Sequence, residues 1–288
     1  SVLKAGAFYL PIDPDFPQER IYYLLKDSNA SLIITKEEIA EIYSHPHEHE
    51  LLHNSNEGGY IIYTSGSTGI PKGVIVGQKA MSNTLHYMAQ HFPCISPDSY
   101  LLKTSFLFDV SVSELFGWFI SGGSLTILEP GAEKEPEKIR DAVQHHHITH
   151  LNFVPSMFNV FVQILSLSDI PRLSSLKYLF IAGEAIWPQL VETARKFFPH
   201  TQLENLYGPT EAAIYSSRYS LMNWQNEQNV PIGKPLANLL LFILDRSYYF
   251  QPIGIPGELY VAGAGLAIGY LNRPELTNER FYAFQGLV

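Results

Sequence analysis

The chain has 288 residues, of which 46% are hydrophobic and 16% are charged, a balance that excludes a disordered protein and suits an α/β protein with a substantial core. Its formal net charge is −9 and it has no block of lysine or arginine, which argues against nucleic acid or a membrane surface as the main partner. No apolar run is long enough to span a membrane. The single Cys94 excludes an internal disulfide and fits a reducing compartment, so a cytoplasmic location is expected.

The first third of the chain predicts a helix and several strands. A strand-like run and a proline-rich turn precede an amphipathic helix that begins at Pro17. A strand is expected at Ser31–Thr35, and residues 36–59 then lose any clear pattern. Strand character returns in "GYIIYT" and in "GVIV", which flank a loop rich in glycine and hydroxyl groups.

Helices and strands alternate over the next part of the chain. The strands are apolar on both sides, as a parallel sheet covered on both faces requires. Helices are predicted over residues 80–92, 112–123, 135–147 and 187–199, and strands over 99–105, 124–129, 149–155, 176–184 and 201–209. From about Tyr215 the pattern changes to short strands between Gly/Pro turns, at residues 238–245 and 257–263, which indicates a β-rich part.

The loop "YTSGSTGIPKGV", Tyr63–Val74, carries the most informative chemistry. Its glycines let backbone N–H groups approach an anion, its hydroxyls add hydrogen-bond donors, and Lys72 adds a positive charge. The alternative is a flexible linker, but a loop between two strand-like runs is held in place rather than tethered. Because the Walker spacing is absent, we expect another kind of nucleotide phosphate loop.

This loop resembles the phosphate-loop signature of the adenylate-forming enzymes, which include acyl-CoA synthetases, luciferases and the adenylation domains of nonribosomal peptide synthetases. Four further motifs of that family follow the family's order and extend over nearly the whole chain. They are "LKAGAFYLPIDPDFPQERI" (Leu3–Ile21), "FDVSVSELF" (Phe108–Phe116), "NLYGPTEAAI" (Asn205–Ile214) and "GELYVAGAGLAIGYLNRPELTNERF" (Gly257–Phe281). The aspartate in "FDVSVSE" is typical of the peptide-synthetase adenylation domains, because acyl-CoA ligases act on substrates without an ammonium group.

The resemblance implies an amino-acid adenylating ligase of secondary-metabolite biosynthesis. It would use ATP and Mg²⁺ to form an aminoacyl-AMP, release pyrophosphate, and load the acyl group onto the phosphopantetheine of a carrier domain. A neighbouring condensation-type domain is a further expected partner in the parent protein. Such chemistry needs positioning and charge neutralisation more than a covalent catalyst.

The resemblance also assigns roles to individual residues. Lys72, Thr210 and Glu211 are the expected catalytic residues, with Glu211 also associated with Mg²⁺, a role that suits an ion reluctant to lose its waters. The expected nucleotide-binding residues are Thr64, Ser65, Gly66, Ser67, Thr68, Gly69, Gly183, Glu184, Asn205 and Tyr207. Asn205 would read the adenine edge and Tyr207 would stack on the ring.

Amino-acid recognition is assigned to Asp109, because a buried carboxylate needs a cation and the substrate's α-ammonium is one. The structural alternative is that Asp109 caps the following helix, and both roles can hold at once. By resemblance, the side-chain pocket is lined by Val110, Ser113, Asn152, Phe180, Ala182, Leu206, Ile214 and Tyr215. This uncharged set predicts a large uncharged amino acid, preferably aromatic with a polar tip, because the small Ser113 would deepen the pocket and Ser113, Asn152 and Tyr215 would offer polar ends.

Two groups of histidines invite a metal hypothesis. The first comprises His45, His47, His49 and His53, and the second comprises His145, His146, His147 and His150. A zinc site needs three or four converging ligands with supporting hydrogen bonds. The first group lies in a weakly patterned stretch and the second ends a helix, so we expect neither to bind a metal.

The expected fold is α/β, with two stacked sheet-and-helix subdomains followed by a β-rich subdomain resembling a distorted barrel. Boundaries are expected at residues 1–97, 98–216 and 217–288. The resemblance begins within an early motif and stops before the family's ribose-binding aspartate and its C-terminal domain, and Gln78 stands where a histidine is common. A partial adenylation domain with impaired activity on its own is therefore expected. The alternatives are a carboxylate–CoA ligase and an inactive nucleotide-binding remnant.

Overall fold

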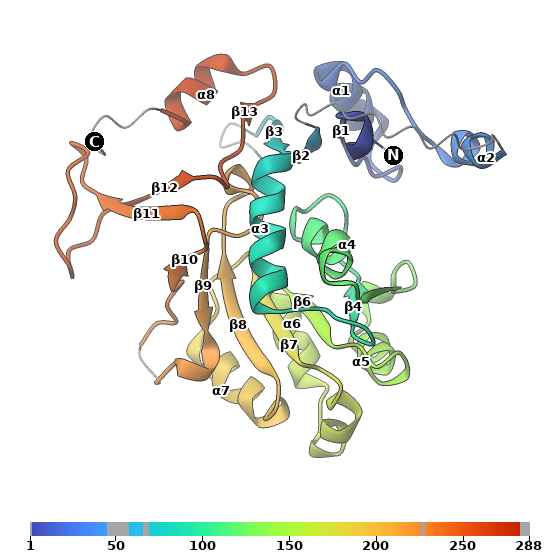
Figure 1. The fold of residues 1–288 in the computed structure, drawn as a ribbon, viewed down its shortest axis with the longest axis vertical. Helices are drawn as coiled ribbons and strands as arrows, with labels where there is room; N and C mark the ends of the chain where they lie inside the picture. The colour runs from blue at the N-terminus through green and yellow to red at the C-terminus, as the bar shows by residue number, and fades with distance from the viewer. Residues whose placement is uncertain (1, 45–57, 66–68, 226–227, 283–288) are drawn as a thin grey trace. The chain divides into compact units, whose positions relative to one another are not determined.

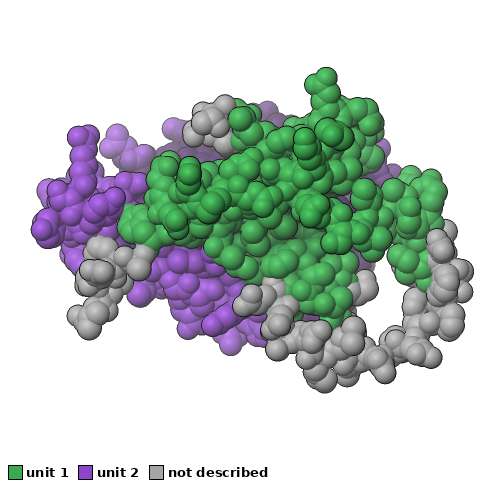
Figure 2. All heavy atoms as spheres, turned by 90° about the horizontal axis from the view of Figure 1, so that it is seen from above, with its two compact units in different colours: residues 1–78, 268–288 green, residues 79–267 purple. Residues whose placement is uncertain are grey.

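The computed structural model describes residues 2–44, 58–65, 69–225 and 228–282 (Figure 1). The chain divides into two compact units, unit 1 with residues 1–78 and 268–288 and unit 2 with residues 79–267 (Figure 2). Each unit contains its own sheet. The boundaries expected near residues 97 and 217 stay predictions.

Unit 1 is built on a four-stranded sheet of order β1-β2-β3-β13. The strands are β1 (Phe8–Tyr9), β2 (Gly59–Thr64), β3 (Lys72–Gly77) and β13 (Gly269–Tyr270). β1 runs parallel to β2, and the other pairs are antiparallel. The helices are η1 (Leu3–Ala5), α1 (Gln18–Ser28), α2 (Lys36–Ser44) and α8 (Pro274–Arg280). α1 begins directly after Pro17, as predicted, because the fixed φ of proline favours the first turn of a helix.

The strand predicted at Ser31–Thr35 is wrong. This segment has no regular structure and is exposed, with Leu32 at 70% and Ile33 at 53% of their maximal accessibility. An apolar run alone does not make a strand, because its backbone also needs a neighbouring strand to bond with. The patternless stretch that follows instead begins with α2.

Unit 2 is built on a seven-stranded sheet of order β10-β9-β8-β7-β6-β4-β5. The strands are β4 (Ser99–Leu102), β5 (Ser124–Ile127), β6 (His150–Phe153), β7 (Tyr178–Ala182), β8 (Gln202–Tyr207), β9 (Ser217–Ser220) and β10 (Lys234–Pro235). β5, β4, β6, β7 and β8 are parallel, and β9 and β10 add antiparallel pairings at one edge. The predicted parallel sheet is therefore present.

Helices cover both faces of this sheet. The main helices of unit 2 are α3 (Gln78–His91), α4 (Val110–Ser121), α5 (Pro136–His145), α6 (Pro155–Gln163) and α7 (Pro188–Phe197). Residues of α5, α6 and α7 share one apolar core with Leu151, Leu179 and Leu203 of the sheet. Side chains alternate along a strand, so Asn152 and Phe180 point to the opposite face, where Ser113 of α4 bonds Asn152 and Phe92, after α3, packs on Phe180.

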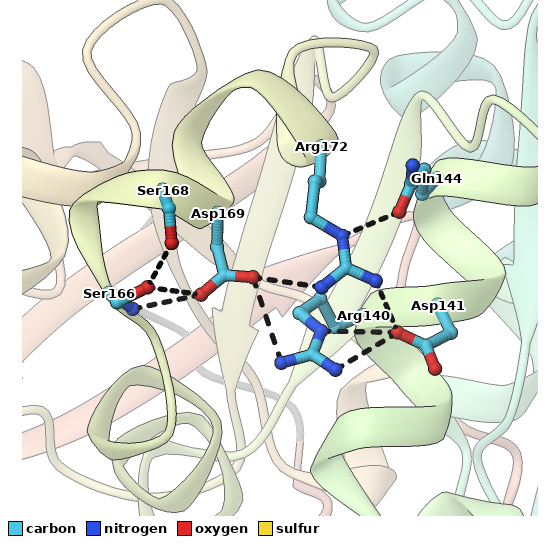
Figure 3. A network of polar contacts seen from close by, with 7 residues as sticks. All are labelled: Arg140, Asp141, Gln144, Ser166, Ser168, Asp169 and Arg172. Atoms are coloured by element: carbon cyan, nitrogen blue, oxygen red, sulfur yellow. Dashed lines mark hydrogen bonds and ion pairs between the residues drawn. The ribbon is translucent and has the colours of Figure 1, made fainter.

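A charged network fastens the 3₁₀ helix η3 (Leu167–Leu173) to α5 (Figure 3). Asp169 accepts hydrogen bonds from the Ser166 backbone N–H and hydroxyl at 3.0 and 2.8 Å and from Arg172 at 3.0 Å. Arg172 also donates to Asp141 of α5 at 2.7 Å. Side chains with several shared partners hold their geometry better than isolated surface pairs do.

The β-rich part that was predicted after residue 216 is present in the described residues. β9 and β10 extend the seven-stranded sheet, and β11 (Leu239–Leu244) pairs with β12 (Glu258–Gly263) in a separate antiparallel hairpin. Within the described ranges these strands do not close a barrel. No described helix has both the length and the apolar character that a membrane crossing requires.

Candidate functional site

Residues predicted to act on the amino acid and the nucleotide gather at the carboxyl ends of the parallel strands of unit 2. Asp109 follows β4, Asn152 lies in β6, Ala182 ends β7 and Tyr207 ends β8. In open α/β sheets this edge is the usual place for a ligand, because the loops that leave the strands surround it. The motifs therefore meet where this architecture places a binding site.

Asp109 is the most informative side chain at this edge. It occupies the N-cap position of α4, yet its side chain makes no capping hydrogen bond. The structure therefore does not support the alternative in which Asp109 caps the helix. Its Oδ2 atom is buried and has no hydrogen-bond partner among the described residues. Burial raises the pKa of Asp109 to about 6, with a smaller contribution from Glu211, while the Thr210 hydroxyl opposes this rise. A cation beside Asp109 would supply the missing partner.

Thr210 and Glu211 begin the short helix η4 (Thr210–Ala212), directly after the tight turn that ends β8. The turn needs Gly208, since a Cβ there would lie 2.5 Å from the Ile214 carbonyl oxygen. The Glu211 backbone carbonyl accepts a bond from the Ala267 N–H at 2.8 Å. Both predicted catalytic residues of this motif also act on Asp109 in the same unit, Thr210 through a hydrogen bond and Glu211 through its charge.

The backbone after η4 adopts an uncommon conformation. Ala213 and Ile214 both have left-handed dihedrals, with φ of 50° and 75°. A β-branched residue such as Ile214 adopts positive φ only when its surroundings enforce it, at a cost of about 1–3 kcal/mol. The Thr84 hydroxyl of α3, which donates to the Ala213 carbonyl, is one such constraint. The surrounding packing therefore offsets the conformational cost of the backbone that positions Ile214 and Tyr215.

Seven of the eight residues predicted to line the side-chain pocket are almost fully enclosed. Their exposures are Ser113 1%, Asn152 1%, Phe180 1%, Ala182 4%, Leu206 1%, Ile214 2% and Tyr215 0%. Val110 alone is partly exposed. The premise that Ser113, Asn152 and Tyr215 offer unpaired polar ends is wrong, because the three are hydrogen-bonded to one another. Spacing along the chain gave no sign of these contacts.

Residues predicted to contact adenine lie at the ends of β7 and β8. Asn205 in β8 is 5% exposed, and its Nδ2 donates to the Pro231 carbonyl at 2.8 Å. Tyr207 is half-buried at the end of the same strand. Gly183 has φ of 91°. Glu184 accepts bonds from the Ser156 backbone N–H and hydroxyl, both at 3.0 Å, and so supports the first turn of α6.

Residues predicted to bind phosphate lie in unit 1, where the loop joins β2 to β3. Thr64 and Lys72 face each other at the base of the loop, as the last residue of β2 and the first of β3. Lys72 Nζ lies 3.0 Å from Tyr270 Oη and 4.1 Å from the centre of the Tyr270 ring. Ser65 and Gly69 are exposed, and Gly69 has φ of 80°. Gly66, Ser67 and Thr68 lie outside the described residues.

The residues that support the loop were not predicted from the sequence. Tyr270 contacts Lys72, and the Tyr23 hydroxyl of α1 donates to the Pro71 carbonyl at 3.0 Å. Tyr270 belongs to the family motif at Gly257–Phe281, but only the pairing of β13 with β3 brings that motif to the loop. For Tyr23, no motif in the sequence indicated a contact with the loop.

The histidines show no sign of a metal site in the part of the chain that the structure describes. His45, His47, His49 and His53 lie outside that part. His150 is fully buried in β6, where its ring contacts the Phe92 carbonyl and the Thr149 hydroxyl, and burial lowers its pKa to about 4. Among the described residues, no three His, Cys, Asp or Glu side chains come together as metal ligands.

Residues 53–271 match the family model of the AMP-binding enzymes. The chain belongs to this family. One of the linear gramicidin synthase proteins of Brevibacillus parabrevis is 45% identical to it, over 98% of this chain and 6% of the relative. Zwittermicin A synthase ZmaJ of Bacillus cereus is 39% identical, over 98% of this chain and 58% of the relative. The chain therefore spans a small part of the first of these relatives and just over half of the second.

Solved structures of nonribosomal peptide synthetases have the same fold. FmoA3 superposes with a TM-score of 0.87 at 28% identity, over 99% of this chain and 32% of FmoA3. Its form with α-methyl-L-serine-AMP superposes with a TM-score of 0.85 at 28% identity, over 99% of this chain and 34% of that one. These likenesses confirm that this AMP-binding enzyme has the expected α/β fold and that its relatives include peptide-synthetase adenylation domains.

Proposed function

We propose that this AMP-binding enzyme activates an α-amino acid with ATP. The amino-acid carboxylate attacks the α-phosphorus, the bond from that phosphorus to the bridging oxygen breaks, and pyrophosphate leaves with the electron pair. The products are aminoacyl-AMP and pyrophosphate. A phosphopantetheine thiol of a carrier domain then loses its proton, its sulfur attacks the acyl carbon, and AMP leaves.

A single observation carries this proposal, the buried Oδ2 of Asp109 without a hydrogen-bond partner among the described residues. A buried carboxylate without a counter-ion is unfavourable, and the α-ammonium of an amino acid supplies one. A fatty acid has no such group, so Asp109 argues against the carboxylate–CoA ligase. The FmoA3 form with an amino-acid adenylate supports the same choice.

Each unit contains side chains that could contact one part of a nucleotide. Lys72 and the hydroxyls of Thr64 and Ser65 suit phosphate oxygens, because each can donate a hydrogen bond to an anion. Tyr207 offers a half-buried ring for adenine to stack on. Thr210 at the start of η4 adds a hydroxyl beside Asp109.

The residues present also fit Mg²⁺ as the accompanying ion. No three metal-binding side chains converge in the described ranges, and Glu211 would hold the ion together with phosphate oxygens and water. The bound ion would neutralise phosphate charge during transfer. This donor set is typical of Mg²⁺ rather than of zinc.

Amino-acid-dependent exchange between ATP and pyrophosphate tests the proposal. In the protein that carries these residues, exchange should require an amino acid and should not respond to a fatty acid. Asp109→Asn should raise the amino-acid KM by at least about 100-fold, since losing one partner of a buried charge pair costs about 3–5 kcal/mol and each 1.4 kcal/mol is about tenfold. Asp98→Asn is the control, because Asp98 is also a buried carboxylate but pairs with Lys177 at 2.6 Å. Exchange without any amino acid, or an unchanged KM in Asp109→Asn, would contradict the proposal.

A further inference from the structure

Four polar side chains of unit 2 form one continuous hydrogen-bonded chain behind Asp109. Tyr100 Oη donates to Asn152 Oδ1 at 3.2 Å, and Asn152 Nδ2 donates to Ser113 Oγ at 3.1 Å. Ser113 Oγ also lies 3.2 Å from Tyr215 Oη and donates to the Val110 carbonyl at 2.8 Å. β4, β6, α4 and the segment after η4 each contribute one member.

The protons in this chain can be assigned without conflict. Ser113 has one hydroxyl proton, which the Val110 carbonyl accepts. Tyr215 must therefore donate to Ser113. The two lone pairs of Ser113 Oγ are then used by Tyr215 and Asn152, and all three hydroxyl protons have acceptors. The polar groups of these four residues are therefore satisfied without a substrate. A polar group on the substrate side chain would gain little binding energy from them.

The same four residues fill the space that the small Ser113 would otherwise leave. Tyr100 is 4% exposed, Ser113 and Asn152 are 1% exposed, and Tyr215 is 0% exposed. An internal cavity that could hold water would leave its walls accessible, so the 0% exposure of Tyr215 leaves no water-sized space against its ring, and the low values of the other three leave little space against them. The Tyr215 ring and the Asn152 amide reach Ser113. The expectation that Ser113 deepens the pocket is therefore wrong.

The available space lies nearer to Asp109. Asp109 and Val110 are partly exposed, whereas Ser113, one helical turn further along α4, is enclosed. Residues i and i+4 share a helix face, so a side chain directed from Asp109 along α4 meets the Ser113–Tyr215 pair within one turn, about 6 Å. This distance favours a short side chain over a ring or a long aliphatic chain.

We infer that the amino acid activated at this site has a small apolar side chain, that of alanine or glycine, and that Tyr100 is a positioning residue for this selection. The inference rests on the proposed function and adds the substrate class. Tyr100 does not reach Asp109 in any described contact, and it acts by holding the Asn152 amide against Ser113. The large amino acid with a polar tip expected from the sequence is replaced by this class.

A substrate panel in the exchange assay tests the class in the protein that carries these residues. Alanine or glycine should give the highest kcat/KM, and valine, leucine, phenylalanine, tyrosine and glutamine should each be at least about tenfold poorer, since one methylene is worth about 10- to 200-fold. Preference for serine, or for any larger or charged amino acid, would overturn the inference and leave the proposed function intact. If none of the amino acids in the panel supported exchange, the proposed function itself would be overturned.

Two variants test the residues. Tyr215→Val should open the space, so that the kcat/KM ratio of leucine to alanine rises at least about tenfold. Tyr219→Val is the matched control, because Tyr219 packs on the core at the opposite face of the sheet. An equal ratio in both variants would overturn the role of Tyr215.

Tyr100→Phe should raise the alanine KM about threefold to tenfold with little change in kcat, because it removes one hydrogen bond. It should also lower the ratio of the kcat/KM for alanine to the kcat/KM for valine. Tyr178→Phe, on the same sheet face, is the control and should change neither value. A merely structural Tyr100 would lower the melting temperature and leave the alanine-to-valine ratio unchanged, which would contradict a positioning role.

Discussion

The Thr84 hydroxyl donates a hydrogen bond to the Ala213 carbonyl oxygen at 2.8 Å. Thr84 lies in α3 and is fully buried, while Ala213 and the following Ile214 hold left-handed dihedrals. The same carbonyl accepts the Tyr215 backbone N–H at 3.0 Å. This bond thus joins α3 to the strained turn that places Ile214 and Tyr215.

Thr84→Val should lower the free energy of unfolding by about 1 kcal/mol, because it removes one hydrogen bond and retains the side-chain shape. It should also raise the amino-acid KM, since Tyr215 follows the turn. Thr193→Val is the control, because the Thr193 hydroxyl bonds the Gln189 carbonyl within α7, on the surface. Urea unfolding and the exchange assay measure the two effects. An equal KM for both variants would contradict a link from α3 to the site.

Asp169 should contribute to stability in a pH-dependent way. Its pKa is lowered, first by the hydrogen bond from the Ser166 backbone N–H and then by the Ser166 hydroxyl and Arg172. A lowered folded-state pKa gives stability that is present above the unfolded value, about 3.9, and lost as pH falls through the folded value. Asp169→Ala should lower the free energy of unfolding by about 2 kcal/mol at pH 7, since it leaves Arg172 and the Ser166 groups without this partner.

The control for Asp169→Ala is Glu137→Gln on the exposed side of α5, which should change stability by less than about 0.5 kcal/mol. Urea unfolding at pH 7 and at pH 3 measures both variants. The deficit of Asp169→Ala should shrink at pH 3. A deficit of the same size at both pH values would mean that packing, and not the charged network of Figure 3, is responsible.

The sequence predicted best the elements with strong local signals. The parallel strands of unit 2 appear because their apolar runs are bounded by turn residues. α4 ends at Ser121 and is capped by Gly122, whose φ of 80° favours glycine. Helix α6 was not predicted, although Pro155 at its first turn and apolar residues at Phe158, Phe161 and Val162 carry the helical spacing. A strand was predicted at Ser31–Thr35, where no neighbouring strand pairs with it in the described residues.

For the candidate site, motifs located the residues but not their contacts. Asp109, Thr210 and Glu211 come from two motifs that the sheet brings together at one edge. The polar chain could not be predicted, because Tyr100 lies 52 residues from Asn152 and Ser113 lies 102 residues from Tyr215. Which polar groups satisfy one another is decided by packing between distant elements, and for that reason the sequence could not show that the polar ends of Ser113, Asn152 and Tyr215 are already paired.

Lys72 and Tyr270 should act together in nucleotide use. The Lys72 ammonium lies 4.1 Å from the Tyr270 ring centre as well as near its hydroxyl. Lys72→Ala should lower kcat by about 100-fold, comparable to removing one charge-stabilising donor elsewhere. Tyr270→Phe keeps the ring and should raise the ATP KM only about twofold to fivefold, while Tyr270→Leu loses the ring as well and should raise it further. Equal KM values for Tyr270→Phe and Tyr270→Leu would show that the ring does not position Lys72.

Asp109 should make both stability and substrate binding depend on pH, in opposite directions. Without substrate its pKa is raised to about 6, so between about pH 4 and 6 the folded chain keeps a proton that the unfolded chain has lost. Stability from this group is therefore full below about pH 4 and falls as pH rises to about 6. Asp109→Asn should remove that fall in urea unfolding across the same range.

Binding of the α-ammonium group requires the ionised form of Asp109. The substrate ammonium keeps its charge below about pH 7, so only the carboxylate titrates in this range. The amino-acid KM should then rise about tenfold for each pH unit below 6, and Asp109→Asn should show a high KM with no such slope. The ATP KM measured in the same series is the internal control, because it does not depend on this ammonium contact. A wild-type amino-acid KM that stays flat from pH 7 to pH 5 would contradict the ion pair between Asp109 and the substrate.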